Sequence, residues 1–138
     1  MNWEAALRSR LIDDSAVAAL VADRVFLKFR PQSSLLPAVV VTMVSDPRPQ
    51  LLGGAVPGRR QSRVQIDCWA DGGNGTAPET RAKVVALREA VIAALAAPGT
   101  FYGVLFGGAG FDPVRDLGEP TETGFLHRDS FDVQLMHN

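Results

Sequence analysis

Residues 63–71 read RVQIDCWAD and contain the only cysteine of the chain, Cys68. Val64, Ile66 and Cys68 alternate with polar or aromatic residues, and successive side chains of a β-strand point to opposite faces of a sheet. The pattern predicts a half-buried strand with Cys68 on its apolar side. Because a buried thiol usually behaves as a small hydrophobic group, we expect Cys68 to pack in the core.

A second strand is expected just before this one, over residues 37–45. Its sequence, PAVVVTMVS, is rich in β-branched residues and carries no charge, as in a strand with neighbours on both sides. The connection 46–62 contains three prolines and three glycines and shows no sustained period. Connections longer than about 12 residues are usually functional or mobile. We therefore expect a strand pair joined by a long functional loop.

Apolar residues at helical spacing predict a helix near the N-terminus and a long helix in the second half of the chain. Thr76 and Glu79 form a capping box where the long helix begins, and Pro98 and Gly99 end it. The predicted elements are helices at 3–12, 16–22 and 76–97, strands at 24–29, 37–45, 63–70, 100–106 and 125–136, and a loop or extended arm at 107–124.

This order of elements predicts one α+β domain over residues 1–138. We expect a mainly antiparallel sheet of about four to five strands, with one long helix packed on a face and an N-terminal helix. The length of 138 residues and the 46% of hydrophobic residues fit a single globular domain with its own core.

The composition excludes several functional classes. Fourteen Lys and Arg against fifteen Asp and Glu give a net charge of −1, which argues against a dedicated nucleic-acid-binding protein. The single cysteine excludes an internal disulfide and a paired-cysteine metal site, and it fits synthesis in a reducing cytosol. The N-terminus lacks a signal-peptide pattern, and the longest apolar stretches fall short of the ~20 residues that cross a bilayer. We expect no membrane partner.

His127 and Asp129 lie two residues apart in the predicted terminal strand and so share a face. Two ligands do not make a metal centre, which needs three or four, so we expect a solvated strand end with no metal and no cofactor. A small hydrolase using Cys68 with His127 or Asp129 is the least favoured alternative, since a nucleophilic thiol needs a base and a lowered pKa. We therefore expect a protein that is not an enzyme.

The glycines at 107–110 do not form a phosphate-binding loop, because no Gly-Lys-Ser/Thr and no helix follow them. The acids Asp112, Asp116 and Glu119 come next, in a segment rich in proline and glycine, where solvated carboxylates are expected.

Arg48, Arg59, Arg60 and Arg63 lie in or beside the long loop, with Asp46 as the only acid of that stretch. Arginine binds carboxylates and phosphates through two parallel hydrogen bonds. The cluster is therefore either a contact for an acidic protein or for DNA, or an ordinary exposed loop.

Apolar residues in the predicted loops have no assigned core partner. Two interpretations stand: they anchor an interface with another chain, or the loops fold back and bury them. A sheet of about five strands in so small a domain also leaves edges to cover, and pairing with a neighbouring copy is one way to cover them. The apolar residues concerned are Leu51, Leu52, Val56 and Phe111.

A succession of short patterns along nearly the whole chain resembles one known family. The patterns are EAALRSRLIDDSAVAALVADRVF, PAVVVTMVSDPRPQLLGG, RVQIDCWAD, the long alanine-rich helix and LHRDSFDVQL. Together they resemble the tail terminator or tail-completion proteins, the head–tail joining proteins of long-tailed phages and gene transfer agents.

The resemblance implies a structural virion protein that carries out no chemistry. It implies a homo-oligomeric ring of six copies on the head-proximal end of the tail tube, which stops tube polymerisation and offers a docking surface to the head connector or stopper. Such a protein would be assembled in the bacterial host cytoplasm and reside in the virion tail. The arginine loop would then reach a ring neighbour, the tube protein or DNA in the channel. The alternative within this setting is another neck protein, a head-side connector or stopper.

Overall fold

The computed structural model describes residues 2–48, 58–73, 78–122 and 124–138. No helix in these ranges is long and apolar enough to cross a membrane. The helices are α1 (Trp3–Asp13), α2 (Ser15–Val21) and α3 (Pro78–Ala96), and the strands are β1 (Val25–Leu27), β2 (Ala38–Ser45), β3 (Arg60–Asp71), β4 (Gly99–Phe101), β5 (Val104–Phe111), β6 (Arg115–Asp116), β7 (Glu119–Thr121) and β8 (Gly124–His137).

The α+β class is confirmed, but the sheet has more strands than the four to five predicted. Its order is β1-β2-β3-β8-β5-β4, and β6 and β7 also pair with β8. Every pairing is antiparallel except that of β1 with β2. The additional strands β4, β6 and β7 have two or three residues each, too few for an alternating pattern to be recognised in the sequence.

The segment predicted as a loop or arm from residue 107 begins as part of strand β5, which runs through the glycines to Phe111. Glycine is depleted in strands, so the sequence favours a loop there. The pairing with β8 decides otherwise, and a Cβ added at Gly107 would lie 3.1 Å from Met136 Cβ. Gly107 therefore suits a close approach of β5 to β8.

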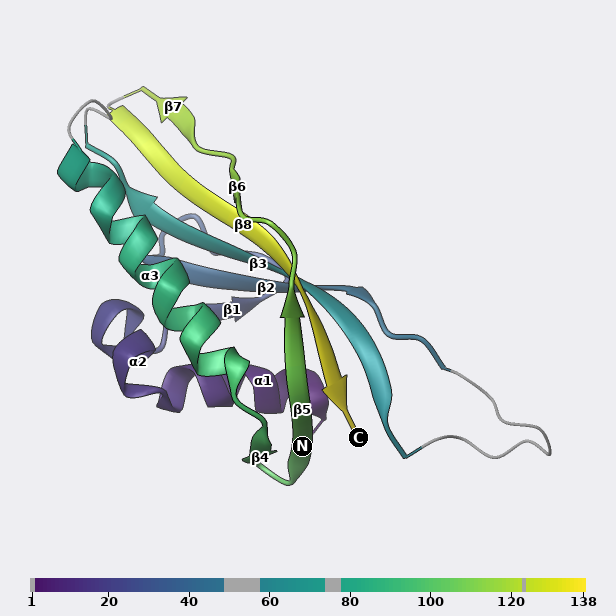
Figure 1. The fold of residues 1–138 in the computed structure, drawn as a ribbon. Helices are drawn as coiled ribbons and strands as arrows, with labels where there is room; N and C mark the ends of the chain where they lie inside the picture. The colour runs from purple at the N-terminus through teal and green to yellow at the C-terminus, as the bar shows by residue number, and fades with distance from the viewer. Residues whose placement is uncertain (1, 49–57, 74–77, 123) are drawn as a thin grey trace.

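The long strand β8 lies inside the sheet and has strand partners along both sides (Figure 1). On one side it pairs with β3 along the whole of β3, from Arg60 opposite His137 to Asp71 opposite Leu126. On the other side β5, β6 and β7 follow one another along it. The segment 112–122 is therefore held against the sheet.

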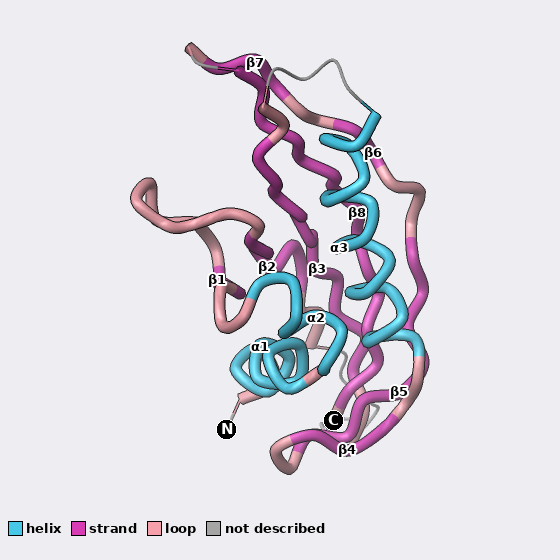
Figure 2. Tube along the Cα trace, turned by 90° about the vertical axis from the view of Figure 1, so that its left-hand side faces the viewer, coloured by secondary structure: helices cyan, strands magenta, loops and turns pink. Residues whose placement is uncertain are grey.

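The helices lie on one face of the twisted sheet (Figure 2): α1 and α3 contact strands, and α2 packs on α1 and α3. The periodic residues of the long helix, Val84, Leu87, Val91 and Leu95, are fully buried, as the pattern predicts. Opposite them lie the inward side chains of β3 and β8, including Cys68, which is also fully buried. The other face of β3 carries polar side chains and one tryptophan.

Side chains cap the N-termini of α1 and α2. The Asn2 side chain accepts a hydrogen bond from Ala5 N and caps α1, and the Asp14 carboxylate accepts from Ala16 N and Val17 N and caps α2. Thr76 of the predicted capping box lies outside the described residues.

Candidate functional site

Asp46, the residue after β2, connects three parts of the chain. Trp3 Nε1 of α1 donates to Asp46 Oδ2 at 3.2 Å, and Ser62 Oγ of β3 donates to Asp46 Oδ1 at 3.0 Å. Ser62 Oγ also lies 2.8 Å from Nε2 of His137, whose ring stacks on Trp3 with 4.5 Å between centroids. A hydrolytic triad places its carboxylate on the histidine, whereas this carboxylate bonds the serine. The network links the start of the β2–β3 connection to α1 and to β3.

The predicted arginine cluster surrounds the same carboxylate. Arg48 Nη2 lies 3.2 Å from Asp46 Oδ2, and Arg60 Nη1 lies 3.8 Å from Asp46 Oδ1. The Arg48 side chain is still 70% exposed, whereas that of Arg60 is 15% exposed. Arg59 is exposed and makes no polar contact with another described residue. Arg48 and Arg59 are therefore the cluster members best placed to meet another molecule.

Arg63 binds two carboxylates of its own chain. Its Nη1 donates to Asp112 Oδ2 at 2.6 Å and to Asp132 Oδ2 at 3.2 Å. The hydrogen bond to Asp112, followed by that to Asp132, raises the pKa of Arg63. Asp112 was expected to be a solvated loop acid, but the extension of β5 brings it beside β3. Arg63 thus joins β3, β5 and β8.

The predicted apolar anchors have different outcomes. Leu51, Leu52 and Val56 lie outside the described residues. Phe111 is half-buried and packs against the core, with its ring 6.4 Å from that of Phe131. This packing agrees with the second interpretation of Phe111, burial within its own domain, because β5 continues to Phe111 and turns this side chain towards β8.

Within the described ranges, β2 and β5 each leave a segment with a strand partner on one side only. β1 pairs with residues 39–41 of β2, so residues 42–45 lack a neighbour on that side. β4 pairs with residues 104–106 of β5, so residues 107–111 are likewise open. Met43 and Val44 on the first segment are 46% and 51% exposed. Open edges with exposed apolar side chains are suited to pairing with another chain.

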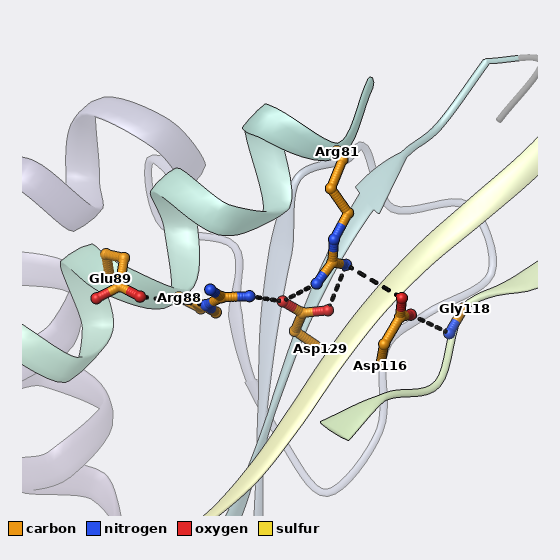
Figure 3. Close-up of polar contacts among 6 residues, drawn as sticks. All are labelled: Arg81, Arg88, Glu89, Asp116, Gly118 and Asp129. Carbon is orange, nitrogen blue, oxygen red and sulfur yellow. Dashed lines mark hydrogen bonds and ion pairs between the residues drawn. The ribbon is translucent and has the colours of Figure 1, made fainter. Parts of the chain in front are cut away.

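Asp129 of β8 was expected at a solvated strand end, but its side chain is fully buried. It accepts two hydrogen bonds from Arg81, at 2.5 and 2.9 Å, and one from Arg88 Nη1 at 2.7 Å (Figure 3). The bond to Asp129 raises the pKa of Arg88. Arg81 also lies 3.8 Å from Asp116, another acid that was expected to be free in solvent. The expectation failed because α3 covers this end of β8.

Sequence reasoning missed this cluster, although one signal was present. Arg81 and Arg88 are seven residues apart, which places them two turns apart on one side of a helix. Their carboxylate partner is 41 to 48 residues further along the chain, so the pairing depends on the tertiary fold. With each Asp129 oxygen bonded to an arginine, the cluster joins α3 to the sheet.

His127 shares the helix-covered face of β8 with Asp129 and is also buried, with 6% exposure. Its ring packs edge-on against Phe125, 5.0 Å away, and a Cβ added at Gly72 would lie 2.8 Å from the imidazole. Among the described residues, no group of three or more His, Cys, Asp or Glu side chains is placed to hold a metal ion.

Cys68 lies opposite Asp129 in the β3–β8 ladder, and no part of it is exposed. Burial raises the pKa of the Cys68 thiol, and the charges of Asp129 and Asp67 raise it further. A catalytic cysteine needs the opposite, an accessible thiol with a lowered pKa. The geometry therefore speaks against the hydrolase alternative.

These features define a class of protein: a small α+β protein in which several ion pairs join its own helices and strands and in which, among the described residues, two segments of the sheet have a strand neighbour on one side only. The model of the family described as "Tail completion protein gp17" matches residues 5–115, which is most of the chain. The chain therefore belongs to the tail completion protein gp17 family and is a structural protein of the phage-tail kind, as the sequence resemblance predicts.

A search of the curated proteins gave no match. Among solved structures, the fold is similar to a chain described as "Virion of native gene transfer agent (GTA) particle", with 20% identity and a TM-score of 0.65. The similarity covers 98% of this chain and 93% of that chain. At this identity the likeness establishes the fold, and it spans almost the full length of both chains.

Proposed function

We propose that this protein is a tail terminator. In this proposal, residues 1–138 form one domain, six copies form a ring on the head-proximal end of the tail tube, and the ring stops tube polymerisation and docks the head connector or stopper. Membership of the tail completion family supports a role in the phage tail. The solved chain of similar fold comes from a gene transfer agent virion, which supports a place in a virion.

The main support for a ring is the presence of two open sheet edges, residues 42–45 of β2 and residues 107–111 of β5. The open segment of β2 lies at one end of the strand order and the open segment of β5 lies towards the other. A ring needs two different complementary surfaces on each copy, because head-to-tail contacts close into cycles. Strand pairing between the β2 edge of one copy and the β5 edge of the next would meet this need.

The arginines and apolar residues of the long connection complete the proposal. Arg48 and Arg59 keep exposed guanidinium groups, and we assign them to contacts with the tube protein, a ring neighbour or DNA in the channel. Arg60 would hold the connection in place from β3 through Asp46, whereas Arg63 and Phe111 are engaged with β8. Leu51, Leu52 and Val56 remain proposed interface anchors.

Light scattering on purified protein, alone and with tube protein, measures the mass of the assembly and so tests whether a ring forms. We expect a mass near six times 14.8 kDa. Val44→Lys and Gly108→Lys place a charge on the two open edges, and a side chain at Gly108 meets no atom within 4 Å. Both variants should fold normally and fail to assemble, because lysine on an edge strand opposes strand pairing.

Leu35→Lys is the matched control, since Leu35 is 71% exposed but lies in the loop between β1 and β2. This variant should still form rings. Edge variants that assemble like the native protein would contradict the proposed interface. In tail assembly the same edge variants should give over-long or headless tails. Co-purification with portal protein in place of tube protein would instead assign the chain to another neck component.

A further inference from the structure

The face of the sheet that the helices leave open contains a pocket of about 360 Å³. Trp69 of β3 lies in its wall, and two guanidinium groups lie over the indole ring. The Arg30 carbon Cζ is 5.2 Å from the ring centroid, and that of Arg128 is 5.0 Å away. Lys28 and the 68% exposed Phe29 complete the rim. The pocket thus combines cations with aromatic surface.

The hydrogen-bonding groups of the pocket are only partly satisfied. Arg128 Nε donates to Asp67 Oδ1 at 2.9 Å, and the other Asp67 oxygen accepts from Gln65 at 3.0 Å, so each oxygen of this carboxylate has a donor. Arg30 Nε and Trp69 Nε1 are buried and have no hydrogen-bond partner among the described residues. Buried donors are normally paired with protein, water or a ligand. Two residues that line this pocket therefore each have an N–H donor without an acceptor among the described residues.

The charge of the pocket indicates which acceptor fits. Lys28, Arg30 and Arg128 supply three positive charges, and the single acid, Asp67, is bonded to Arg128. Lys28 also has φ +80°, a left-handed backbone conformation that is uncommon outside glycine. Its amide donates to Val41 O at 2.8 Å, which holds this conformation in place. Strained backbone of this kind is frequent at binding sites.

We propose that this pocket, called here the Trp69 pocket, binds a carboxylate side chain from an acidic segment of a partner protein. Arginine and indole N–H groups donate to carboxylate oxygens, and Phe29 and Val40 offer apolar surface to the rest of the segment. Nucleic acid fits less well, because phosphates need cations spaced along a track, whereas these lie around one small cavity. The proposal rests on the pocket itself and does not depend on the ring.

The experiment uses the full chain labelled with ¹⁵N and a hexaglutamate peptide as the probe. The protein has two indole N–H groups, and that of Trp3 is bonded to Asp46 on another part of the surface. We expect the Trp69 indole signal to shift and saturate with added peptide while the Trp3 signal stays unchanged. A hexaglutamine peptide should produce no shift.

Arg30→Gln and Lys28→Gln should each weaken hexaglutamate binding about tenfold, the size expected for one charge-assisted contact. Lys83→Gln on α3 is the matched control, because it removes an exposed lysine on the helix side of the molecule. Arg128→Gln is less suitable, since it leaves the buried Asp67 without its cation. The two rim variants keep the Asp67–Arg128 pair intact.

An unchanged Trp69 signal at millimolar peptide would overturn the proposal, as would equal affinities for the native chain and Arg30→Gln. Tighter binding of oligothymidylate than of hexaglutamate, weakened by the same rim variants, would overturn it in favour of nucleic acid. A Trp69 shift that depends on protein concentration without any peptide would overturn it in favour of a second copy of this chain.

Discussion

Arg81 of α3 and Asp129 of β8 form a two-bond ion pair, with donor–acceptor distances of 2.5 and 2.9 Å (Figure 3). Arg88 adds a third bond to the same carboxylate, which is fully buried, while the arginine side chains are 31% and 22% exposed. The long helix is thus joined to the sheet by charge as well as by its apolar residues.

Asp129→Ala should lower the free energy of unfolding by about 3–5 kcal/mol, because it leaves two arginines against a buried site without their carboxylate. Asp116→Ala is the matched control, since the Asp116 side chain is 60% exposed and lies 3.8 Å from Arg81. That control should cost at most about 1 kcal/mol. Urea unfolding followed by circular dichroism measures both, and equal losses would show that Asp129 has no special structural role.

Cys68 should be inert to thiol reagents in the folded protein at neutral pH and should react once the protein is unfolded, because it is buried and protonated. Cys68→Ala should cost on the order of 1 kcal/mol of stability and leave tail assembly intact. Rapid labelling of the native chain, or loss of assembly in Cys68→Ala, would contradict this prediction and favour the cysteine hydrolase hypothesis.

The raised pKa of Cys68 also predicts a pH dependence of stability. In the unfolded chain the thiol ionises near its ordinary value of 9.0, whereas in the folded chain it stays protonated to higher pH. Above pH 9 the unfolded state therefore binds fewer protons, and stability falls by up to about 1.4 kcal/mol per pH unit. Cys68→Ala should show a smaller loss over the same range. Parallel pH profiles for the two proteins would contradict the buried thiol.

Arg10 of α1 caps the end of α3. Its Nη2 donates to Ala94 O at 2.9 Å and to Ala97 O at 2.5 Å, and its guanidinium lies 4.2 Å from the Phe101 ring centroid. Burial lowers the pKa of Arg10, although Asp14 opposes this effect. Arg10→Met should cost about 2–3 kcal/mol, the loss of charge-assisted bonds to helix-terminal carbonyls.

The control for Arg10 is Arg59→Met, which changes an exposed arginine and should alter stability by less than about 0.5 kcal/mol. Thermal unfolding of the two variants compares them directly. A stability loss in Arg10→Met no larger than that in the control would mean that the α1–α3 contact depends on apolar packing alone.

Asp46→Asn should change the fluorescence of Trp3, because Asp46 accepts the Trp3 indole N–H as well as the Ser62 hydroxyl. Asparagine keeps one acceptor oxygen and loses the charge that holds Arg48 and Arg60. We expect a stability loss of about 1–2 kcal/mol. Gln61→Ala, an exposed change in the same region of β3, should leave the Trp3 emission unaltered.

The core of this fold could be predicted from local patterns. Val64, Ile66 and Cys68 face the helices as their alternation predicts, and Val84 and Leu87 are buried as their helical spacing predicts. These predictions succeed because period-2 and period-3.6 patterns report which side of one element meets the core. They carry no information on which element lies opposite.

Long-range pairing explains the failures. Strands β6 and β7 exist because β8 offers them a backbone edge, and their own residues show no strand pattern. His127 and Asp129 were expected in solvent because the strand alone does not reveal that α3 covers it. The core contact of Phe111 could not be assigned from the sequence for the same reason: the continuation of β5 depends on β8.

The sequence by itself determined the α+β class, the faces of the main strand and the long helix, the absence of an internal disulfide and the membership of a tail completion family. Only the tertiary structure decided that β8 is shared by β3 and three successive partners, that Asp129 joins helix to sheet, and that two sheet edges and the Trp69 pocket remain open. The physical reason is range: periodicity and capping act between residues a few positions apart, whereas strand pairing, buried ion pairs and pockets are formed by residues tens of positions apart that the folded chain brings together.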